Sequence, residues 1–238
     1  MDLSPELETE LLFYIEPYVR QFCGPMFFTK SLETAKGNII ANGSFGLVDT
    51  GERRLLVTCH HVWDEFQNAR LKDENLKMCV CLDIRSPVLF DPIAPIDENR
   101  ELDLATFDIS DLEQACRGRK FYPLSLNPPR AIANDDRLFF IGFPGKGREV
   151  RESDGALGFV RAPFAVLVCG VSSTKFLADI SDLALLPQEF GGVSGCPCFL
   201  VRVDRAPHLV GFATSVWSNC LSITHAKCLN RDGTLRAP

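Results

Sequence analysis

From residue 38 onward the chain consists of short apolar runs, rich in β-branched and aromatic residues, that are separated by Gly, Pro, Asn and Asp. Runs of this length and composition are typical of strands in an antiparallel sandwich or barrel. The turn Asp49-Thr50-Gly51-Glu52 favours a hairpin between two runs, because glycine tolerates the backbone conformation of a tight reversal. The expected strands are residues 39–48, 55–58, 77–84 and 104–109, followed by 137–142, 156–160, 164–171, 176–180, 196–203, 209–216 and 220–223.

A polar stretch with several prolines, including Asn127-Pro128-Pro129, divides these runs into two groups. Since proline punctuates strands and favours loops, we expect a linker over residues 117–135. The sequence therefore predicts an all-β protein of two six-stranded antiparallel β-barrels, the first over residues 38–116 and the second, with a C-terminal tail, over 136–238.

Residues 1–37 are predicted to form a helical extension before the barrels. A short helix is expected over residues 7–22, because Leu7, Leu11 and Ile15 recur at helical spacing before Gly24-Pro25 ends the pattern. Three roles stay open for this helix: it covers the second barrel, docks a partner or gates a cleft between the barrels.

The composition limits the partners that such a protein would bind. The 238 residues are 46% hydrophobic, which is enough for a substantial core. The net charge of −6 comes without a basic stripe of the kind that holds phosphate backbones, so nucleic acid is not expected as a partner. The apolar runs are too short to cross a bilayer, and the residues after Met1 lack the pattern of a signal peptide. We therefore expect a soluble cytoplasmic protein that contacts no membrane.

The ten cysteines are expected to be free thiols, because a chain without an export signal stays in a reducing compartment. Two pairs have the spacing Cys-x-Cys, namely Cys79 with Cys81 and Cys196 with Cys198. On a strand this spacing places both sulfurs on one face, so a metal site is an open alternative. Structural zinc usually takes Cys-x2-Cys pairs, which favours packed thiols.

Three segments carry the residue types that acyl transfer by a serine requires. The block Thr58-Cys59-His60-His61-Val62 ends an apolar run, Leu102-Asp103-Leu104-Ala105 begins one, and Gly191-Gly192-Val193-Ser194-Gly195-Cys196-Pro197 surrounds a serine with glycines. Such chemistry needs a nucleophilic hydroxyl, an imidazole base, a carboxylate that orients the imidazole, and backbone donors for the oxyanion. The three blocks together contain all of these groups.

These blocks resemble those of the trypsin-like, chymotrypsin-fold serine peptidases, and most of all the bacterial cytoplasmic and high-temperature-requirement-type members without a PDZ domain. The surroundings of His61, Asp103 and Ser194 are similar to the family's Thr-x-x-His-Val/Cys, Asp-Leu/Ile-Ala and Gly-x-Ser-Gly-x-Pro motifs, in the family's order. The resemblance implies that these three residues form a catalytic triad and that the amides of Gly192 and Ser194 form the oxyanion hole. It also implies that no cofactor is required.

Each of these residues also has a structural interpretation. A serine among glycines is ordinary turn chemistry, His61 fits a buried hydrogen-bonded histidine, and Asp103 fits a surface acid. His60, the neighbour of His61, is expected to be a structural histidine. Cys196 is a rival nucleophile, although Ser194 occupies the turn position of the motif.

The resemblance also implies a substrate pocket. Counting six residues back from the nucleophile places Gln188 at the floor of the S1 pocket, where trypsin-like members have an aspartate, with Glu189 beside it. Aligning Thr214 with the family's substrate-pairing serine places Ser215 and Val216 along the pocket wall, with Val216 at the position where a glycine keeps large pockets open. We expect a preference for small or medium uncharged P1 residues.

The sequence thus predicts a serine endopeptidase that acts on protein or peptide substrates through an acyl-enzyme intermediate. One alternative is a catalytically silent peptide-binding module or scaffold on the same fold, because a fold does not guarantee an activity. The other is a structural metal-binding protein built on the cysteines, whereas the peptidase interpretation includes no metal.

Overall fold

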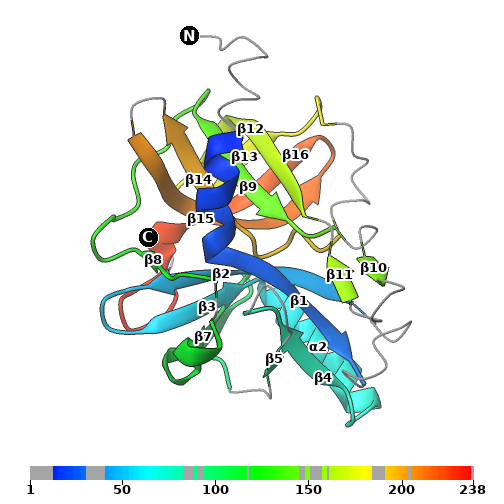
Figure 1. Cartoon of the computed structure of the whole chain (residues 1–238). Coiled ribbons are helices and arrows are strands. Elements are labelled where there is room, and N and C mark those ends of the chain that lie inside the picture. Colours follow the sequence, from blue (N-terminus) through cyan, green and yellow to red (C-terminus); the bar gives the residue numbers. More distant parts are fainter. Residues whose placement is uncertain are drawn as a thin grey trace.

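The computed structural model describes residues 13–30, 41–82, 88–90, 94–116, 118–144, 148–150, 157–159, 161–183, 191–202 and 205–236. These residues form two β-sheet bodies, one above the other in Figure 1, with the N-terminal helix along the side of the upper body. Strands predominate, which confirms the predicted all-β, two-barrel architecture. None of the described helices is long and apolar enough to span a bilayer.

The upper body is a closed barrel of six strands in the order β12-β13-β16-β15-β14-β9, all antiparallel. On β12 the residues alternate between the interior and the surface, with Phe164, Val166 and Val168 buried and Leu167 exposed. The predicted six-stranded form of this barrel is confirmed, whereas the strand expected over residues 156–160 is described only at 157–159 and lies outside the barrel. Its strands are β9 (Arg137–Gly142), β12 (Ala162–Val171), β13 (Lys175–Asp179), β14 (Pro197–Arg202), β15 (Arg205–Trp217) and β16 (Cys220–His225).

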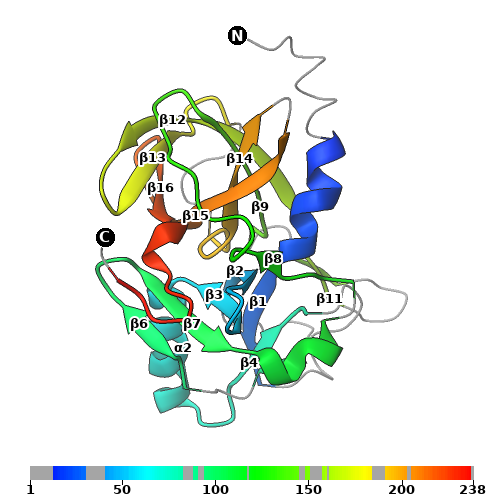
Figure 2. The same ribbon diagram turned by 90° about the vertical axis from the view of Figure 1, so that its left-hand side faces the viewer.

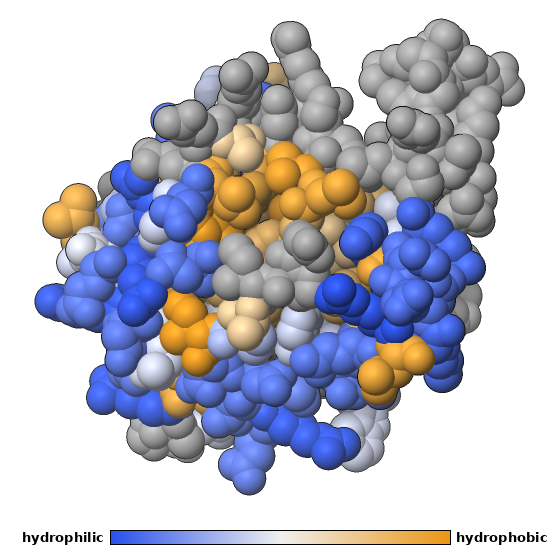
Figure 3. Space-filling model, turned by 90° about the horizontal axis from the view of Figure 1, so that it is seen from below, coloured by the Kyte–Doolittle hydropathy of each residue, from blue (hydrophilic) through white to orange (hydrophobic). Residues whose placement is uncertain are grey.

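The lower body is a curled sheet with more strands than the predicted six. Within the described residues it has eight strands in the order β5-β4-β1-β2-β3-β7-β6, with β8 paired to β2 in parallel. These strands are β1 (Cys23–Thr29), β2 (Asn42–Asp49), β3 (Arg54–Thr58), β4 (Lys77–Val80), β5 (Val88–Phe90), β6 (Asp97–Asn99), β7 (Leu104–Asp108) and β8 (Tyr122–Pro123). A separate pair is formed by β10 (Arg148–Val150) and β11 (Leu157–Phe159). From below, hydrophobic residues gather near the middle of this face, and hydrophilic residues lie to both sides and below them in the view (Figure 3).

Strand β1 is absent from the strands expected from the sequence. All seven of its residues are buried, and its Gly24-Pro25 pair resembles the end of a helix. The strand lies between β2 and β4 and belongs to the lower sheet.

The N-terminal helix covers residues 13–19 and continues into the short 3-10 helix η1 (Arg20–Phe22). Ile15 and Val19 are buried in the cluster between the two bodies, and Glu16 forms an ion pair of 2.6 Å with Arg161. The described part of the helix therefore covers the second barrel, whereas residues 1–12 lie outside the described residues. The other helices are α2 (His60–Lys72), η2 (Ser110–Ala115) and η5 (Ala226–Cys228).

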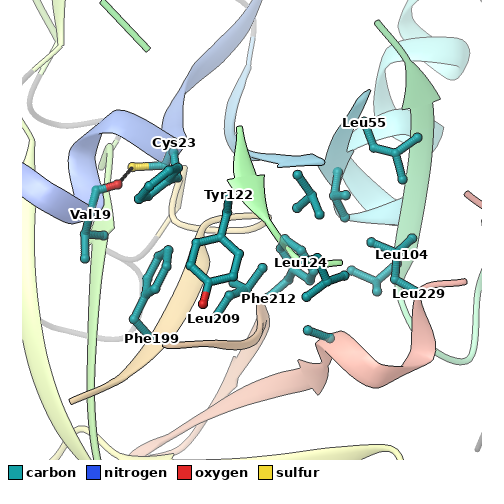
Figure 4. Close-up of a cluster of buried hydrophobic side chains, with 14 of the residues drawn as sticks. Val19, Cys23, Leu55, Leu104, Tyr122, Leu124, Phe199, Leu209, Phe212 and Leu229 are labelled. Atoms are coloured by element: carbon teal, nitrogen blue, oxygen red, sulfur yellow. Dashed lines mark hydrogen bonds between the residues drawn. The ribbon is translucent and has the colours of Figure 1, made fainter. Parts of the chain in front are cut away.

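A hydrophobic cluster joins the two bodies and fixes their relative position. Figure 4 shows Tyr122 of β8 beside Phe199, Leu209 and Phe212 of the upper barrel, and Figure 2 shows β8 running between the bodies. The Tyr122 ring lies 5.5 Å from that of Phe199, a distance typical of edge-to-face aromatic contacts. Because a buried cluster of this kind is close-packed, it can hold residues of the two bodies at fixed distances.

Candidate active site

His61 and Asp103 are in direct contact. His61 lies in the first turn of α2, immediately after β3, and its Nδ1 is 2.8 Å from Asp103 Oδ2 and 3.0 Å from Oδ1. The backbone amide of His61 also donates to Asp103 Oδ1 at 3.0 Å. Beside an ionised carboxylate the Nδ1 carries the proton, which leaves Nε2 with a free lone pair. The carboxylate therefore sets both the tautomer and the orientation of the imidazole.

The neighbouring histidine has a different environment. His60 Nδ1 is 3.5 Å from Glu98 Oε2 and has no hydrogen-bond partner among the described residues, and only 18% of its side chain is exposed. In contrast, 47% of the His61 side chain is exposed. The structure thus places His61, and not His60, next to the predicted acid.

Asp103 is held in an uncommon backbone conformation, with a φ of 55°. It lies in the turn between β6 and β7, where Asn99 Oδ1 accepts hydrogen bonds of 3.0 Å from the amides of Glu101 and Leu102. From the upper barrel, Thr224 Oγ1 donates to the carbonyl of Leu102 at 2.6 Å. A left-handed aspartate persists where its surroundings over-determine it, and here both bodies contribute.

Ser194 lies in a glycine-rich turn before β14 that rests on β2 of the lower body. Ser44 donates twice to this turn, from its amide to the Ser194 carbonyl at 2.8 Å and from its hydroxyl to the Gly192 carbonyl at 2.6 Å. Gly192 has a φ of +97°, and a Cβ there would lie 2.2 Å from Asn42 Nδ2 and 2.4 Å from the carbonyl oxygen of Phe143. This position requires glycine for its conformation and for the close approach of Asn42.

The turn presents two free donors. In the part of the chain that the structure describes, the amides of Gly192 and Ser194 donate no hydrogen bond. Unused backbone donors beside a serine are what an oxyanion requires. Neither of the predicted oxyanion donors is therefore used by another group among the described residues.

The Ser194 hydroxyl donates to the carbonyl oxygen of Thr214 at 3.3 Å. No hydrogen bond joins it to His61 among the described residues. The structure brings His61 and Asp103 together. Ser194 lies on the turn that β2 supports, but the Ser194 hydroxyl is hydrogen-bonded to the Thr214 carbonyl and not to His61.

Cys59 adds a thiol that the sequence analysis did not include in the site. Cys59, His61 and Asp103 each offer one ligand atom, and these atoms lie within 4.8 Å of one another, so the group could hold a metal ion. However, Cys59 is fully buried, and burial together with the Asp103 charge raises its pKa well above the usual thiol value. Its thiol donates to the Ala213 carbonyl at 3.2 Å. A metal would need the thiolate, so this donor set suits a metal poorly.

All ten cysteines are free thiols in this structure. Burial raises the pKa of both Cys79 and Cys81 to about 12 and that of Cys196 well above its usual value. Within the described ranges, Cys59, His61 and Asp103 are the only residues that form a group of three potential metal ligands. Neither Cys-x-Cys pair is therefore part of such a group.

The predicted pocket wall lies on β15. Thr214 is buried and donates from Oγ1 to the Ser222 carbonyl at 3.1 Å, at an irregularity in the pairing of β15 with β16. Ser215 is exposed and Val216 is half-buried. Gln188 and Glu189, the predicted pocket floor, lie outside the described residues.

Three positioning residues, Asn42, Ser44 and Thr224, were missed by the sequence analysis. Each contacts the site through a backbone group of a segment distant in sequence, with Asn42 Nδ2 donating to the Phe143 carbonyl at 2.9 Å. A polar residue at a strand end gives no local signal of such a contact.

No protein-family model and no curated protein matches the chain. Among solved structures, Deg5 has a TM-score of 0.51 at 17% identity, over 93% of this chain and 91% of that one. The Rv3671c protease from M. tuberculosis, in its active form, has a TM-score of 0.51 at 13% identity, over 95% and 84%. A chain from a study of the Sesbania mosaic virus VPg protein has a TM-score of 0.50 at 14% identity, over 85% of both chains. Together with the topology above, these likenesses show that the chain has the chymotrypsin-like double-barrel fold.

Proposed function

We propose that the chain is a serine endopeptidase of the trypsin-like kind, with Ser194 as nucleophile, His61 as general base and Asp103 as the group that orients it. The observation that carries the proposal is the contact of 2.8 Å between His61 Nδ1 and Asp103 Oδ2. A glycine-bracketed serine turn with unused amides, rigidly supported by β2, adds the other two requirements of acyl transfer.

In this mechanism the Ser194 hydroxyl gives its proton to His61 Nε2 while its oxygen attacks the carbonyl carbon of a peptide bond. The carbonyl oxygen becomes an oxyanion, and the amides of Gly192 and Ser194 donate hydrogen bonds to it. Asp103 stabilises the imidazolium that forms without taking its proton. His61 then protonates the leaving amine, and an acyl-enzyme remains on Ser194.

Hydrolysis of the acyl-enzyme repeats these steps with water. His61 Nε2 takes a proton from the water, whose oxygen attacks the ester carbonyl, and the same two amides hold the second oxyanion. The proton returns to the Ser194 oxygen as the carboxylic acid leaves. All the protein groups in this cycle come from this chain, and the substrate is a protein or peptide.

A catalytically silent peptide-binding module remains the second candidate. The hydrogen bond of 3.3 Å from Ser194 to the Thr214 carbonyl favours it, because this hydroxyl is paired with an acceptor other than the base. The two functions differ in whether Ser194 becomes nucleophilic.

A fluorophosphonate probe tests the proposal, because it forms a covalent bond with an activated serine hydroxyl. We expect labelling at Ser194, located by mass spectrometry of the digested protein, and no labelling of Ser194→Ala or His61→Ala. Ser173→Ala is the matched control, since Ser173 is an exposed serine between β12 and β13, outside the proposed site, and it should label like the wild type. If the folded wild type stays unlabelled while a reference serine peptidase reacts, the silent binding module is the better description.

A further inference from the structure

A cavity of about 250 Å³ lies where the turn between β2 and β3, the segment after β8 and the segment after β16 meet. None of its lining residues belongs to the candidate active site. In Figure 1 the C-terminal segment, coloured red, passes the β2–β3 hairpin and β8 at this side of the molecule. The chemistry of the cavity is therefore independent of the peptidase proposal.

The cavity is basic. Its lining residues include Lys227, Arg231 and Arg236 and no acidic residue. All three are exposed, and among the described residues none of them forms an ion pair. In a chain with a net charge of −6, three unpaired cations around one hollow form a local field that attracts anions.

The acidic residues nearest in sequence are held by other groups. Asp232 Oδ1 accepts hydrogen bonds from the amide and the hydroxyl of Thr234, at 3.0 and 2.7 Å. Asp49 accepts from the Gly51 amide at 2.8 Å and lies 3.9 Å from Arg54. Both carboxylates therefore interact with neighbouring groups of the chain, and neither residue lines the cavity.

Hydrogen bonds hold the backbone of the segment that carries the basic residues. Thr50 Oγ1 donates to the Arg231 carbonyl at 2.6 Å, and the Arg236 amide donates to the Cys228 carbonyl at 2.8 Å. Asn230 Nδ2 donates to Thr234 Oγ1 at 2.8 Å. A ligand would therefore meet cations whose backbone is already positioned, which lowers the ordering cost of binding.

We propose that this basic cavity binds a phosphate group, carried by a small organic phosphomonoester. Two guanidinium groups and an ammonium supply three positive charges, which is more than enough to neutralise a phosphate dianion, and guanidinium forks donate to phosphate oxygens in pairs. The hydroxyl-bearing Ser125 also lines the cavity, as do the rings of Pro128 and Pro129. The apolar proline rings would contact the organic part of the ester.

The test is titration of the full-length protein with phenyl phosphate and, separately, with inorganic phosphate, by isothermal calorimetry at low ionic strength. We expect saturable binding of one phenyl phosphate per chain, with a weaker affinity for inorganic phosphate because it lacks the ring. Arg231→Gln and Arg236→Gln should each weaken binding by about tenfold or more, since each removes a charge-assisted hydrogen bond.

Arg70→Gln is the matched control, because it removes the same charge from α2, outside the cavity lining. It should bind phenyl phosphate like the wild type, and thermal unfolding should show that all three variants are folded. Equal affinities for the two probes, with the same loss in both cavity variants, would support a site for inorganic phosphate itself. The proposal is overturned if neither probe saturates, or if Arg231→Gln and Arg236→Gln bind as tightly as Arg70→Gln. The measurement needs no turnover, so its result is separate from that of the peptidase test.

Discussion

The Ser194 hydroxyl donates to the carbonyl oxygen of Thr214 at 3.3 Å, while the imidazole of His61 is fixed by Asp103. Thr214 is itself buried in β15, so the acceptor is a rigid part of the second barrel. A rotation about the Cα–Cβ bond of Ser194, between staggered positions, changes the partner of this hydroxyl. Catalytic hydrogen bonds often tighten only in the substrate complex. The peptidase proposal therefore places the serine–histidine hydrogen bond in that complex.

Ser194→Ala is expected to abolish turnover of a peptide substrate while leaving the melting temperature within about 2 °C of the wild type. The hydroxyl supplies the nucleophile, but its one hydrogen bond among the described residues is long and contributes little to stability. Activity assays and thermal unfolding of the same preparations check both parts. Residual turnover at the wild-type rate would show that another group is the nucleophile, and Cys196→Ala would then be the next variant to examine.

Asp103→Asn is expected to lower kcat by about 10³-fold or more, because an amide beside His61 Nδ1 favours the wrong tautomer of the base. His61→Ala should be similarly inactive. His60→Ala should keep most of the activity, since within the described residues His60 forms no hydrogen bond with Asp103 or Ser194. An inactive His60→Ala together with an active His61→Ala would reverse the assignment of the base.

Gly192→Ala is expected to destabilise the fold by about 2 kcal/mol or more and to abolish activity. Its φ of +97° disfavours alanine, and the added Cβ would lie 2.2 Å from Asn42 Nδ2. Gly170→Ala on β12 is the control, because the nearest atom to its added Cβ is 3.7 Å away. Chemical denaturation of the two variants measures the difference in unfolding free energy. Equal stabilities would mean that the serine turn adapts without cost.

The sequence predicted most of the second barrel because its strands are short apolar runs bounded by turn residues. Strand β9 was predicted with its observed bounds, Arg137–Gly142, although it is almost completely buried. Strand β1 escaped because Gly24-Pro25 within it resembled a helix stop. Turn residues report local structure, whereas the pairing of β1 with β2 and β4 depends on segments distant in sequence.

The candidate site shows the same division between local and distant information. His61, Asp103 and Ser194 were found because each lies in a short motif. Ser44 was not found, although it donates both to the Ser194 carbonyl and to the Gly192 carbonyl. Its role depends on the packing of β2 against a turn about 150 residues later in the chain, and a single sequence carries no record of such a contact.

His225→Gln is expected to flatten the dependence of stability on pH below about 6.5. Burial lowers the pKa of His225, whose Nε2–H donates to the Ser172 carbonyl at 3.2 Å. Between its folded and unfolded pKa values the unfolded chain binds more protons than the folded chain. The stability that depends on neutral His225 is therefore complete above about pH 6.5 and is lost as the pH falls below it. Denaturation of both proteins from pH 8 to pH 5 measures this loss of unfolding free energy. If the unfolding free energies of the wild type and the variant fall in parallel, His225 is not the group responsible.

Val216→Gly is expected to widen the specificity of the peptidase. The wild type should cleave after small or medium uncharged residues such as Ala, Val, Thr and Ser, because the half-buried Val216 narrows the proposed pocket while packing against the core of the second barrel. Removing its branched side chain should raise kcat/KM for a Phe or Leu at P1 by about tenfold or more relative to Ala, since an overfilled pocket costs on the order of 1 to 3 kcal/mol.

The control is Val171→Gly on β12, which makes the same substitution elsewhere in the barrel, at a valine that is 46% exposed. It should leave the ratio of kcat/KM for Phe or Leu to kcat/KM for Ala unchanged. Cleavage-site profiling with a peptide library measures all three proteins, and a dominant signal for Lys or Arg in the wild type would refute the small pocket and point to Glu189 as the specificity acid.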